Sequence, residues 1–386
     1  MNRIYLDNAA TTPLAPEVLE AMTTCLREEF GNPSSIHAFG RRSRAAVERA
    51  RRTVADRLHG MPGDIIFTSG GTEADNMALA CSVRDRGVRH LITSPIEHHA
   101  IEHTAHELGR SGPVQVHWVR LDADGRADLA HLEELLAANP RALVSLMHAN
   151  NEVGTRNDLH AIGTLCRRHQ ALFHSDTVQT MGHYAFDLHT LPVDMLSASA
   201  HKFHGPKGVG FLYLREGTGL KPMIQGGAQE RNMRGGTENV AGIVGLATAL
   251  DLAYAHLEEH QRHVRGLKDH MIARLRAEVP GVAFNGDIGP DSLYTVLNVR
   301  FPDDGKAEML IYHLDIEGIA CSGGSACSSG SNAGSHVLGA LYPDVTGANI
   351  RFSFSRYTTR EEIDRTVNVL KKVLGVPVAP AARATA

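Results

Sequence analysis

Short apolar runs alternate with amphipathic stretches over most of the first 255 residues of the chain. Six of these runs predict buried strands, at 64–69, 90–94, 114–119, 142–147, 171–176 and 194–199. Most of them are followed by stretches with helical periodicity, at 73–83, 97–108, 129–137 and 159–169. A seventh run, 208–214, predicts a further strand that could be antiparallel to the others. Apolar strands that alternate with helices are typical of an α/β fold with a largely parallel sheet.

The pattern changes near residue 237, where almost continuous helical periodicity begins and extends to about residue 278. Beyond it, the pattern predicts strands at 293–301, 318–322 and 349–354, with helices near 307–314 and 359–374. This succession predicts a second, smaller α+β domain. We therefore expect a large domain of residues 15–255, a small domain of residues 1–14 and 256–376, and a disordered Pro/Ala-rich tail at 377–386.

The composition is that of an ordinary globular protein, and it narrows the range of partners. The net charge of −4 gives no general attraction to nucleic acid or to an anionic membrane. No apolar run approaches the roughly 18–20 residues of a transmembrane helix, and the N-terminus does not resemble a secretory signal. The five cysteines are odd in number and mostly far apart, which favours free thiols in a reducing cytoplasm over a disulfide framework.

Histidine is unusually frequent, with 23 residues, and several of them fall in the stretch EHHAIEHTAHE. His99, His103 and His106 are spaced so that one face of a helix could carry all three. A solvated helix face is the favoured interpretation. A metal site is the alternative, but no pattern of cysteines or carboxylates elsewhere completes a ligand set of usual spacing.

The stretch FTSGGTEADN is the first candidate for binding chemistry. A predicted strand ends at Thr68 or Ser69, Gly70 and Gly71 turn the chain, and a helix starts near Thr72. Free N–H groups and the positive end of a helix form a natural phosphate cradle, although a capped turn without a ligand would have the same pattern. The stretch matches neither a Walker A loop nor a G-x-G-x-x-G fingerprint, so ATP and NAD are not indicated.

Two further strand ends carry charged side chains. Asp176 ends a predicted strand in HSDTVQT, where its carboxylate could hold a cationic ring nitrogen and Gln179 could reach a neighbouring ring oxygen. Lys202 follows the next strand, in SASAHKFHGPKG, where a partly desolvated amine could form a Schiff base. Separately, the first could be an ordinary capping Asp and the second a surface Lys. Together with the phosphate cradle, they are the three elements that pyridoxal phosphate requires.

The sequence resembles the cysteine desulfurases of the NifS/IscS type, which belong to the class V aminotransferases among the fold-type I pyridoxal-phosphate enzymes. The resemblance covers roughly residues 4–370. The ordered motifs that carry it are YLDNAATTP, GNPSSIH, FTSGGTEADN, EHHA, ANNEVGT, HSDTVQ, SAHKFHGPKG, RGGTEN, SGGSACSSGS and IRFSFSRYTT. This resemblance implies a mainly parallel central sheet in a large domain and a smaller α+β domain.

The resemblance also implies a role for each residue that matches a family motif. Lys202 would form the Schiff base with the cofactor, Asp176 would pair with the pyridine nitrogen, and His98 would stack on the ring and act in proton transfer. The ring oxygen would be bound by Gln179 and Asn151, and the phosphate by Gly71, Thr72, Ser199 and His201.

The remaining carried-over residues concern the substrate and a second subunit. Thr237 would reach the phosphate of the neighbouring subunit, which implies a homodimer with shared sites. Arg351 would bind the substrate carboxylate, and Asn32 would lie near the substrate. Cys327, in a Gly/Ser-rich loop, would accept sulfur as the nucleophile, whereas Cys321 matches no catalytic position and is either a packed thiol or a relay for the persulfide.

The implied reaction converts L-cysteine to L-alanine and leaves the sulfur on Cys327 as a persulfide, for transfer to an acceptor such as an iron–sulfur scaffold protein. The loop after the cysteine motif reads SNAGSH and departs from the Leu-Glu-Pro-like stretch common in the family, so the identity of the acceptor stays open. A selenocysteine lyase or a class V aminotransferase on the same fold is the alternative. A non-catalytic Cys/His scaffold for a metal or cluster is disfavoured, because such clusters usually take four thiolates.

Overall fold

The computed structural model describes residues 3–112, 114–302, 309–323, 334–344 and 347–376 of the chain. They separate into two compact units. The large unit comprises Thr11–Asn150 and Thr155–Leu257, and the small unit comprises Met1–Ala10, Asn151–Gly154 and Glu258–Ala386. The hydrophobic pattern does not mark the short segment Asn151–Gly154, which belongs to the small unit although the large unit flanks it on both sides.

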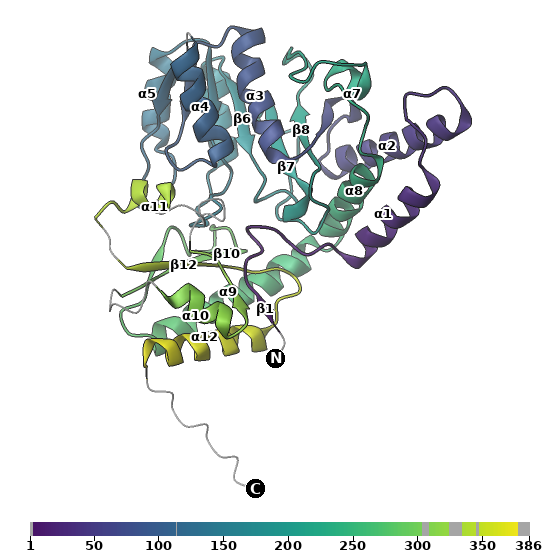
Figure 1. Ribbon diagram of the computed structural model, residues 1–386. Coiled ribbons are helices and arrows are strands. Elements are labelled where there is room, and N and C mark those ends of the chain that lie inside the picture. The colour runs from purple at the N-terminus through teal and green to yellow at the C-terminus, as the bar shows by residue number, and fades with distance from the viewer. Residues whose placement is uncertain (1–2, 113, 303–308, 324–333, 345–346, 377–386) are drawn as a thin grey trace. The chain divides into compact units, whose positions relative to one another are not determined.

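The large unit is built on a seven-stranded sheet, in the order β2-β8-β7-β6-β5-β3-β4 (Figure 1). Its strands are β2 Ile65–Thr68, β3 His90–Thr93, β4 Gln115–Trp118, β5 Ala142–Ser145, β6 Leu172–Asp176, β7 Met195–Ser199 and β8 Gly210–Leu214. Strands β3 to β7 pair in parallel, whereas β8 is antiparallel to both of its neighbours, β7 and β2. The expected parallel α/β fold and the antiparallel seventh strand are both confirmed.

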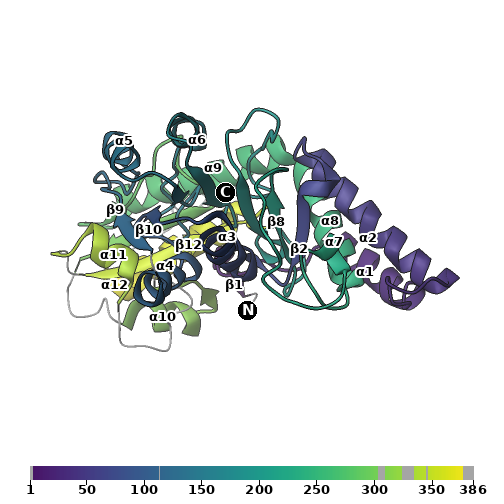
Figure 2. The same ribbon diagram turned by 90° about the horizontal axis from the view of Figure 1, so that it is seen from above.

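Helices cover both faces of this sheet, because its strands are apolar on both sides. Leu143 of β5 packs on one face with α3 Gly71–Arg86 and α4 His99–Ser111. Its neighbours Ala142 and Val144 face the opposite core, formed with α2 Ala38–Arg57, α5 Leu129–Ala138, α6 Leu159–Arg168 and α8 Val240–Ala255. Figure 2 shows α3 and α4 on one side of the sheet and α5 and α6 on the other. Helix α1, Pro16–Glu28, packs on α8.

The small unit combines two short sheets with helices. A three-stranded antiparallel sheet has the order β12-β10-β9, with β9 Ala283–Asn285, β10 Val296–Phe301 and β12 Ala348–Ser353. A parallel pair joins β1 Ile4–Tyr5 to β11 Ile319–Ala320, which brings the first strand of the chain to the strand before Cys321. The helices are α9 Leu257–Glu278, α10 Leu310–Ile316, α11 His336–Leu341 and α12 Arg360–Leu374.

The long helical stretch expected from residue 237 to 278 is two helices rather than one. Helix α8 ends at Ala255, and α9 begins at Leu257 after a non-helical residue, His256. The run AYAHLEE around the break contains neither Gly nor Pro, so the sequence does not mark the end of the first helix. Among the described residues, no single helix is long and apolar enough to cross a membrane, and α8 and α9 meet that test only if taken together.

A buried ion pair fixes the loop that leads to Thr237. Arg51 of α2 donates from Nη1 and Nη2 to the two carboxylate oxygens of Glu230, each over 2.7 Å, and both side chains are almost fully buried. Glu230 also accepts the backbone N–H of Phe67 in β2. It begins three successive residues with positive φ, Glu230, Arg231 and Asn232, in the short segment α7 Gln229–Asn232. Left-handed backbone at non-glycine residues is costly, so this segment depends on the ion pair.

Glu230→Ala is expected to lower the free energy of unfolding by about 3–5 kcal/mol, because it leaves the Arg51 guanidinium buried without its anion. Unfolding in urea measures this loss. The matched control is Glu48→Ala, which removes the 37% exposed partner of the same arginine and should cost less than about 1 kcal/mol. Equal losses in the two variants would contradict the role of the buried pair.

Candidate active site

Several polar residues of the large unit gather at the carboxyl edge of the parallel strands. Asp176 and Ser199 are the last residues of β6 and β7. Gly71 opens α3 after β2, and His98 is the N-cap of α4 after β3. Parallel strands present their carboxyl ends on one edge of a sheet, which is where open α/β folds bind ligands.

The phosphate cradle is predicted at the start of α3. A Cβ atom built on Gly71 would lie 2.5 Å from Cγ2 of Val178 and 3.7 Å from Cβ of Ser199, so the helix start packs directly against the turns after β6 and β7. Gly70, the N-cap, offers no side chain to the first N–H groups of the helix. Those N–H groups and the positive helix end are therefore available to an anion beside Ser199.

Asp176 is a buried carboxylate at the end of β6, with 6% of its surface exposed. Its Oδ1 accepts the backbone N–H of Val178 over 2.8 Å. Burial raises the pKa of Asp176 to about 6, and the Val178 N–H and the charge of Lys202 oppose this rise. A buried anion of this kind is stabilised by a cationic partner, which a protonated ring nitrogen supplies.

Lys202 stands in a short 3-10 turn, Ala200–Lys202, that follows β7 directly. Its neighbour His201 is tied to the N-terminal part of the large unit, because its Nδ1 lies 3.1 Å from Oγ1 of Thr11 and its carbonyl accepts the N–H of Thr12. Burial and the charges of Lys202 and Lys207 lower the pKa of His201 to about 4, so this ring is neutral at physiological pH. The turn thus fixes the lysine at the sheet edge beside an uncharged imidazole.

Asp75 of α3 joins the group, although sequence reasoning did not select it. The ligand atoms of Asp75, His98 and Asp176 all lie within 4.8 Å of one another. Asp75 is 1% exposed, and its Oδ1 has no hydrogen-bond partner among the described residues. Burial, with help from the charges of Asp176 and Glu97, raises its pKa well above the usual range. The raised pKa favours the protonated form of Asp75, which lowers the repulsion between its carboxyl group and that of Asp176.

A buried histidine, His174, lies next to Asp75. His174 of β6 lies 2.9 Å from Ser145 Oγ through Nδ1 and 2.9 Å from Ser197 Oγ through Nε2, and its Nε2 is 3.6 Å from Asp75 Oδ1. Burial lowers the pKa of His174 to about 3, so it adds no positive charge. His174 thus adds a polar but uncharged group beside Asp75 and does not cancel the charge of Asp176.

The other predicted residues of the large unit are placed less tightly. Gln179 is buried in the turn after β6. Thr72 and Thr237 are exposed. Thr237 lines a small cavity together with Ser69, immediately before the cradle. Asn32 lies in the exposed loop between α1 and α2, where its Oδ1 accepts the N–H of Ser34 over 2.9 Å.

The small unit holds three more of the predicted residues. Arg351 of β12 is 1% exposed, donates to the carbonyl of Asn151 over 2.9 Å and pairs with Asp7 over 3.1 Å. Its Nε has no hydrogen-bond partner among the described residues. Burial, with the charges of Asp7 and Asp315, raises the pKa of Cys321 to about 12. Cys327 lies outside the described residues.

The residues of the large unit fit pyridoxal phosphate. The open helix start at Gly71 with Ser199 suits the phosphate, the buried Asp176 carboxylate suits a protonated pyridine nitrogen, and Lys202 supplies the amine. His98, within 4.8 Å of Asp176, offers an aromatic ring at the same place. The donor set is therefore that of an aldehyde cofactor with a phosphate and a ring cation.

Comparison with known proteins shows the family of the chain. The aminotransferase class-V family model matches residues 4–366. The chain belongs to this family. It is 46% identical over 380 residues to a cysteine desulfurase of Cereibacter sphaeroides, with 97% of this chain and 96% of the relative covered. It is 43% identical over 377 residues to cysteine desulfurase IscS of Dictyoglomus turgidum, with coverages of 96% and 94%.

A solved structure confirms the fold class. A NifS-like protein superposes with a TM-score of 0.89 at 37% identity and covers 97% of this chain and 100% of its own. Members of the class V family use pyridoxal 5'-phosphate, which is the cofactor of this chain. The resemblance to the NifS/IscS type that the motifs indicated is likewise confirmed.

Asp176→Asn is expected to stabilise the cofactor-free protein at pH 7 by on the order of 2 kcal/mol while weakening its affinity for pyridoxal phosphate. The folded pKa of Asp176 is raised to about 6, so ionisation costs nothing below its unfolded pKa of about 4 and its full cost above pH 6. The stabilisation should therefore be absent at pH 4 and grow up to pH 6, as urea unfolding at each pH measures.

The control for this experiment is Asp56→Asn, at an exposed position of α2. It should leave stability and cofactor affinity unchanged at every pH. If Asp176→Asn shifted stability equally at pH 4 and pH 7, its effect would be one of packing rather than of charge.

Proposed function

We propose that this chain is a pyridoxal-phosphate-dependent cysteine desulfurase that converts L-cysteine to L-alanine and places the sulfur on Cys327. The observation that carries the proposal is the convergence of a buried Asp176 with His98 and with the charge of Lys202. The near full-length likeness to cysteine desulfurases supports the choice of reaction. The cofactor, when bound, withdraws electrons from the substrate Cα.

Three residues of the large unit are assigned to proton transfer and to holding the ring nitrogen: Lys202, His98 and Asp176. The Lys202 amine takes the proton from the substrate Cα, because it is the base that the turn after β7 holds at the sheet edge. Asp176 places its negative charge against the ring nitrogen. Burial keeps the neighbouring His174 neutral, so this imidazole adds no positive charge beside Asp176. His98 faces this group from the start of α4 and is placed to move a proton to or from the substrate.

Sulfur transfer needs a thiolate, and the two candidate cysteines differ in this respect. The raised pKa of Cys321, about 12, keeps it a protonated thiol and a weak nucleophile at neutral pH. We assign the nucleophile to Cys327. Its thiolate attacks the substrate sulfur, a Cys327–sulfur bond forms as the substrate Cβ–sulfur bond breaks, and the net products are L-alanine and a persulfide.

Arg351 is assigned to the substrate carboxylate. A buried guanidinium with a donor to spare is suited to a planar anion, and its contacts with Asp7 and the Asn151 carbonyl hold it in one orientation. Asn32 is kept as a residue near the substrate. Gln179 and Asn151 are assigned to the ring oxygen, and Thr72 and His201 to the phosphate.

We also propose a homodimer in which the exposed Thr237 reaches the phosphate of the neighbouring subunit. The persulfide sulfur then passes to an acceptor protein, for which an iron–sulfur scaffold is our candidate. The name IscS of one relative is consistent with that acceptor. The loop SNAGSH, part of which lies outside the described residues, is where we place the choice of acceptor.

Single-cysteine variants test the assignment of the nucleophile. Cys327→Ser should lower sulfide release from L-cysteine by at least about 100-fold while cysteine still perturbs the cofactor absorbance. Cys321→Ser should stay within about twofold of the parent, because a thiol that is not ionised contributes little. Lys202→Ala should lack the borohydride-reducible absorbance. Full turnover in Cys327→Ser would instead favour an aminotransferase or another nucleophile.

Arg351→Lys tests the assignment of the carboxylate site. Loss of the planar two-pronged donor should raise KM for L-cysteine by about 10–100-fold, with the cofactor retained. Asp7→Asn is the comparison variant, since it removes the ion pair but leaves the guanidinium in place. Equal damage from both variants would mean that Arg351 is a structural residue only.

A further inference from the structure

One face of α4 gathers three histidines around a glutamate, outside the group of residues assigned to the reaction. His99, His103 and His106 follow the spacing i, i+4 and i+7, and Glu102 lies between them. The run from His99 to His103 has the form H-x-x-E-H. In a helix this spacing places both imidazoles and the carboxylate on the same side.

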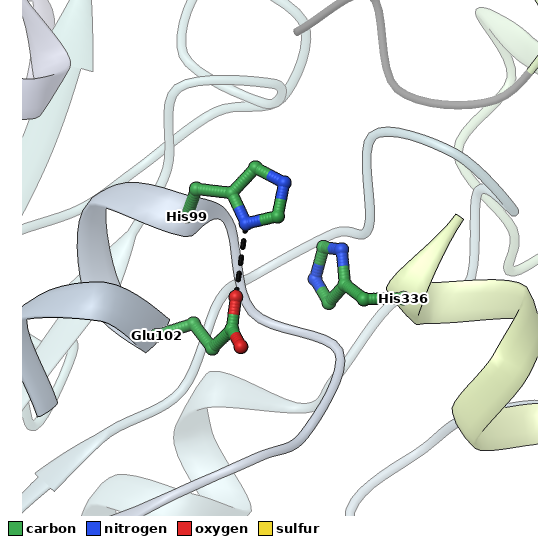
Figure 3. Close-up of side chains that lie close together, drawn as sticks. All are labelled: His99, Glu102 and His336. Carbon is green, nitrogen blue, oxygen red and sulfur yellow. Dashed lines mark hydrogen bonds and ion pairs between the residues drawn. The ribbon is translucent and has the colours of Figure 1, made fainter. Parts of the chain in front are cut away.

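The glutamate carboxylate lies within reach of all three rings. His99 Nδ1 is 2.9 Å from Glu102 Oε2, as Figure 3 shows, and His103 Nε2 is 3.7 Å from the same oxygen. His106 Nε2 is 3.7 Å from the other oxygen, Oε1. The His99 and His103 rings lie stacked, with centroids 4.7 Å apart.

These side chains differ in how much of their surface is exposed to water. Glu102 and His99 are 20% and 27% exposed, so the hydrogen bond between them is partly shielded from water. His103 is 72% exposed, so it can change rotamer without a steric cost. His106 packs against the ring of Trp118 in β4, with centroids 5.1 Å apart, which holds it beside the carboxylate.

We propose that this face of α4 binds a divalent late transition-metal ion, with His99, Glu102 and His103 as ligands. Imidazole nitrogen and carboxylate oxygen are the donors that Zn²⁺, Co²⁺ and Ni²⁺ take in proteins. The ion replaces the proton between His99 and Glu102, and His103 turns toward it from its exposed position. His106 supports the second carboxylate oxygen as an outer partner.

The site is distinct from the assigned reaction residues, since His98 faces Asp176 while His99 points to Glu102. The two neighbouring histidines therefore have different carboxylate partners, although their ring centroids are 6.3 Å apart. His98 also caps α4 by accepting the N–H of Ala100 over 3.1 Å. An ion that bridges positions 99, 102 and 103 would lock the turn that presents His98.

The test measures the affinity of the cofactor-loaded protein for Zn²⁺ by competition with a chromophoric chelator. All variants carry Cys327→Ser, which removes the assigned thiolate, and the protein with this change alone is the parent. The parent should bind one Zn²⁺. His103→Ala and Glu102→Gln should each weaken binding by at least about 10-fold, and His106→Ala by less. His59→Ala, at a 64% exposed histidine away from α4, is the matched control and should bind as the parent does.

A Co²⁺ spectrum of the same protein identifies the donors. Nitrogen and oxygen ligation without a thiolate charge-transfer band is expected. No Zn²⁺ binding by the parent, equal binding by parent and His103→Ala, or a thiolate band that accompanies the bound ion would each overturn the proposal.

Discussion

The rest of the site depends on one buried carboxylate, that of Asp176 at the end of β6. Asp176 is almost fully buried, and Asp75 lies close enough that two negative charges there would repel strongly. The surrounding groups are consistent with keeping only one charge. The raised pKa of Asp75 favours its protonated form, His174 is neutral, and the Val178 N–H and the charge of Lys202 stabilise the Asp176 carboxylate. A ring cation at this place would offset the cost of burying the Asp176 charge, which couples cofactor affinity to the stability of the large unit.

Much of this edge was predictable because it follows from strand ends. Asp176, Ser199 and Lys202 each stand at or just after the end of an apolar run, and β6 and β7 pair in parallel, so their carboxyl ends lie on one edge of the sheet. Gly71 follows β2, which reaches the same edge only because the antiparallel β8 lies between β2 and β7; this strand order is not visible in the sequence. Side chains that act from the end of a buried strand are visible in a single sequence for this reason.

Asp75 was not predictable in the same way. It lies one turn into α3, in the run EADN, where a polar residue reads as part of a solvated helix face. Its burial comes from packing against β6 and β7, which no local pattern records. Arg351 itself was predicted from a family motif, but its pairing with Asp7 was not, because the two residues are 344 positions apart in the sequence. The break at His256 left no signal either, because neither Gly nor Pro lies near the end of α8 or the start of α9. The only indication for Asp75 was its place four residues after Gly71, on the helix that opens the cradle.

The position of β2 has a consequence for how the protein is assembled during synthesis. Among the described strands, β2 hydrogen-bonds only to β8, from Ile65 opposite Tyr213 to Thr68 opposite Gly210. The strand that leads into the α3 cradle is thus translated early but has no partner until about 140 further residues have left the ribosome. Strands β3 to β7 can pair first, since each has a parallel neighbour nearer in the chain. The cradle therefore closes late, and a nascent chain has no complete cofactor site until β8 has been inserted between β2 and β7.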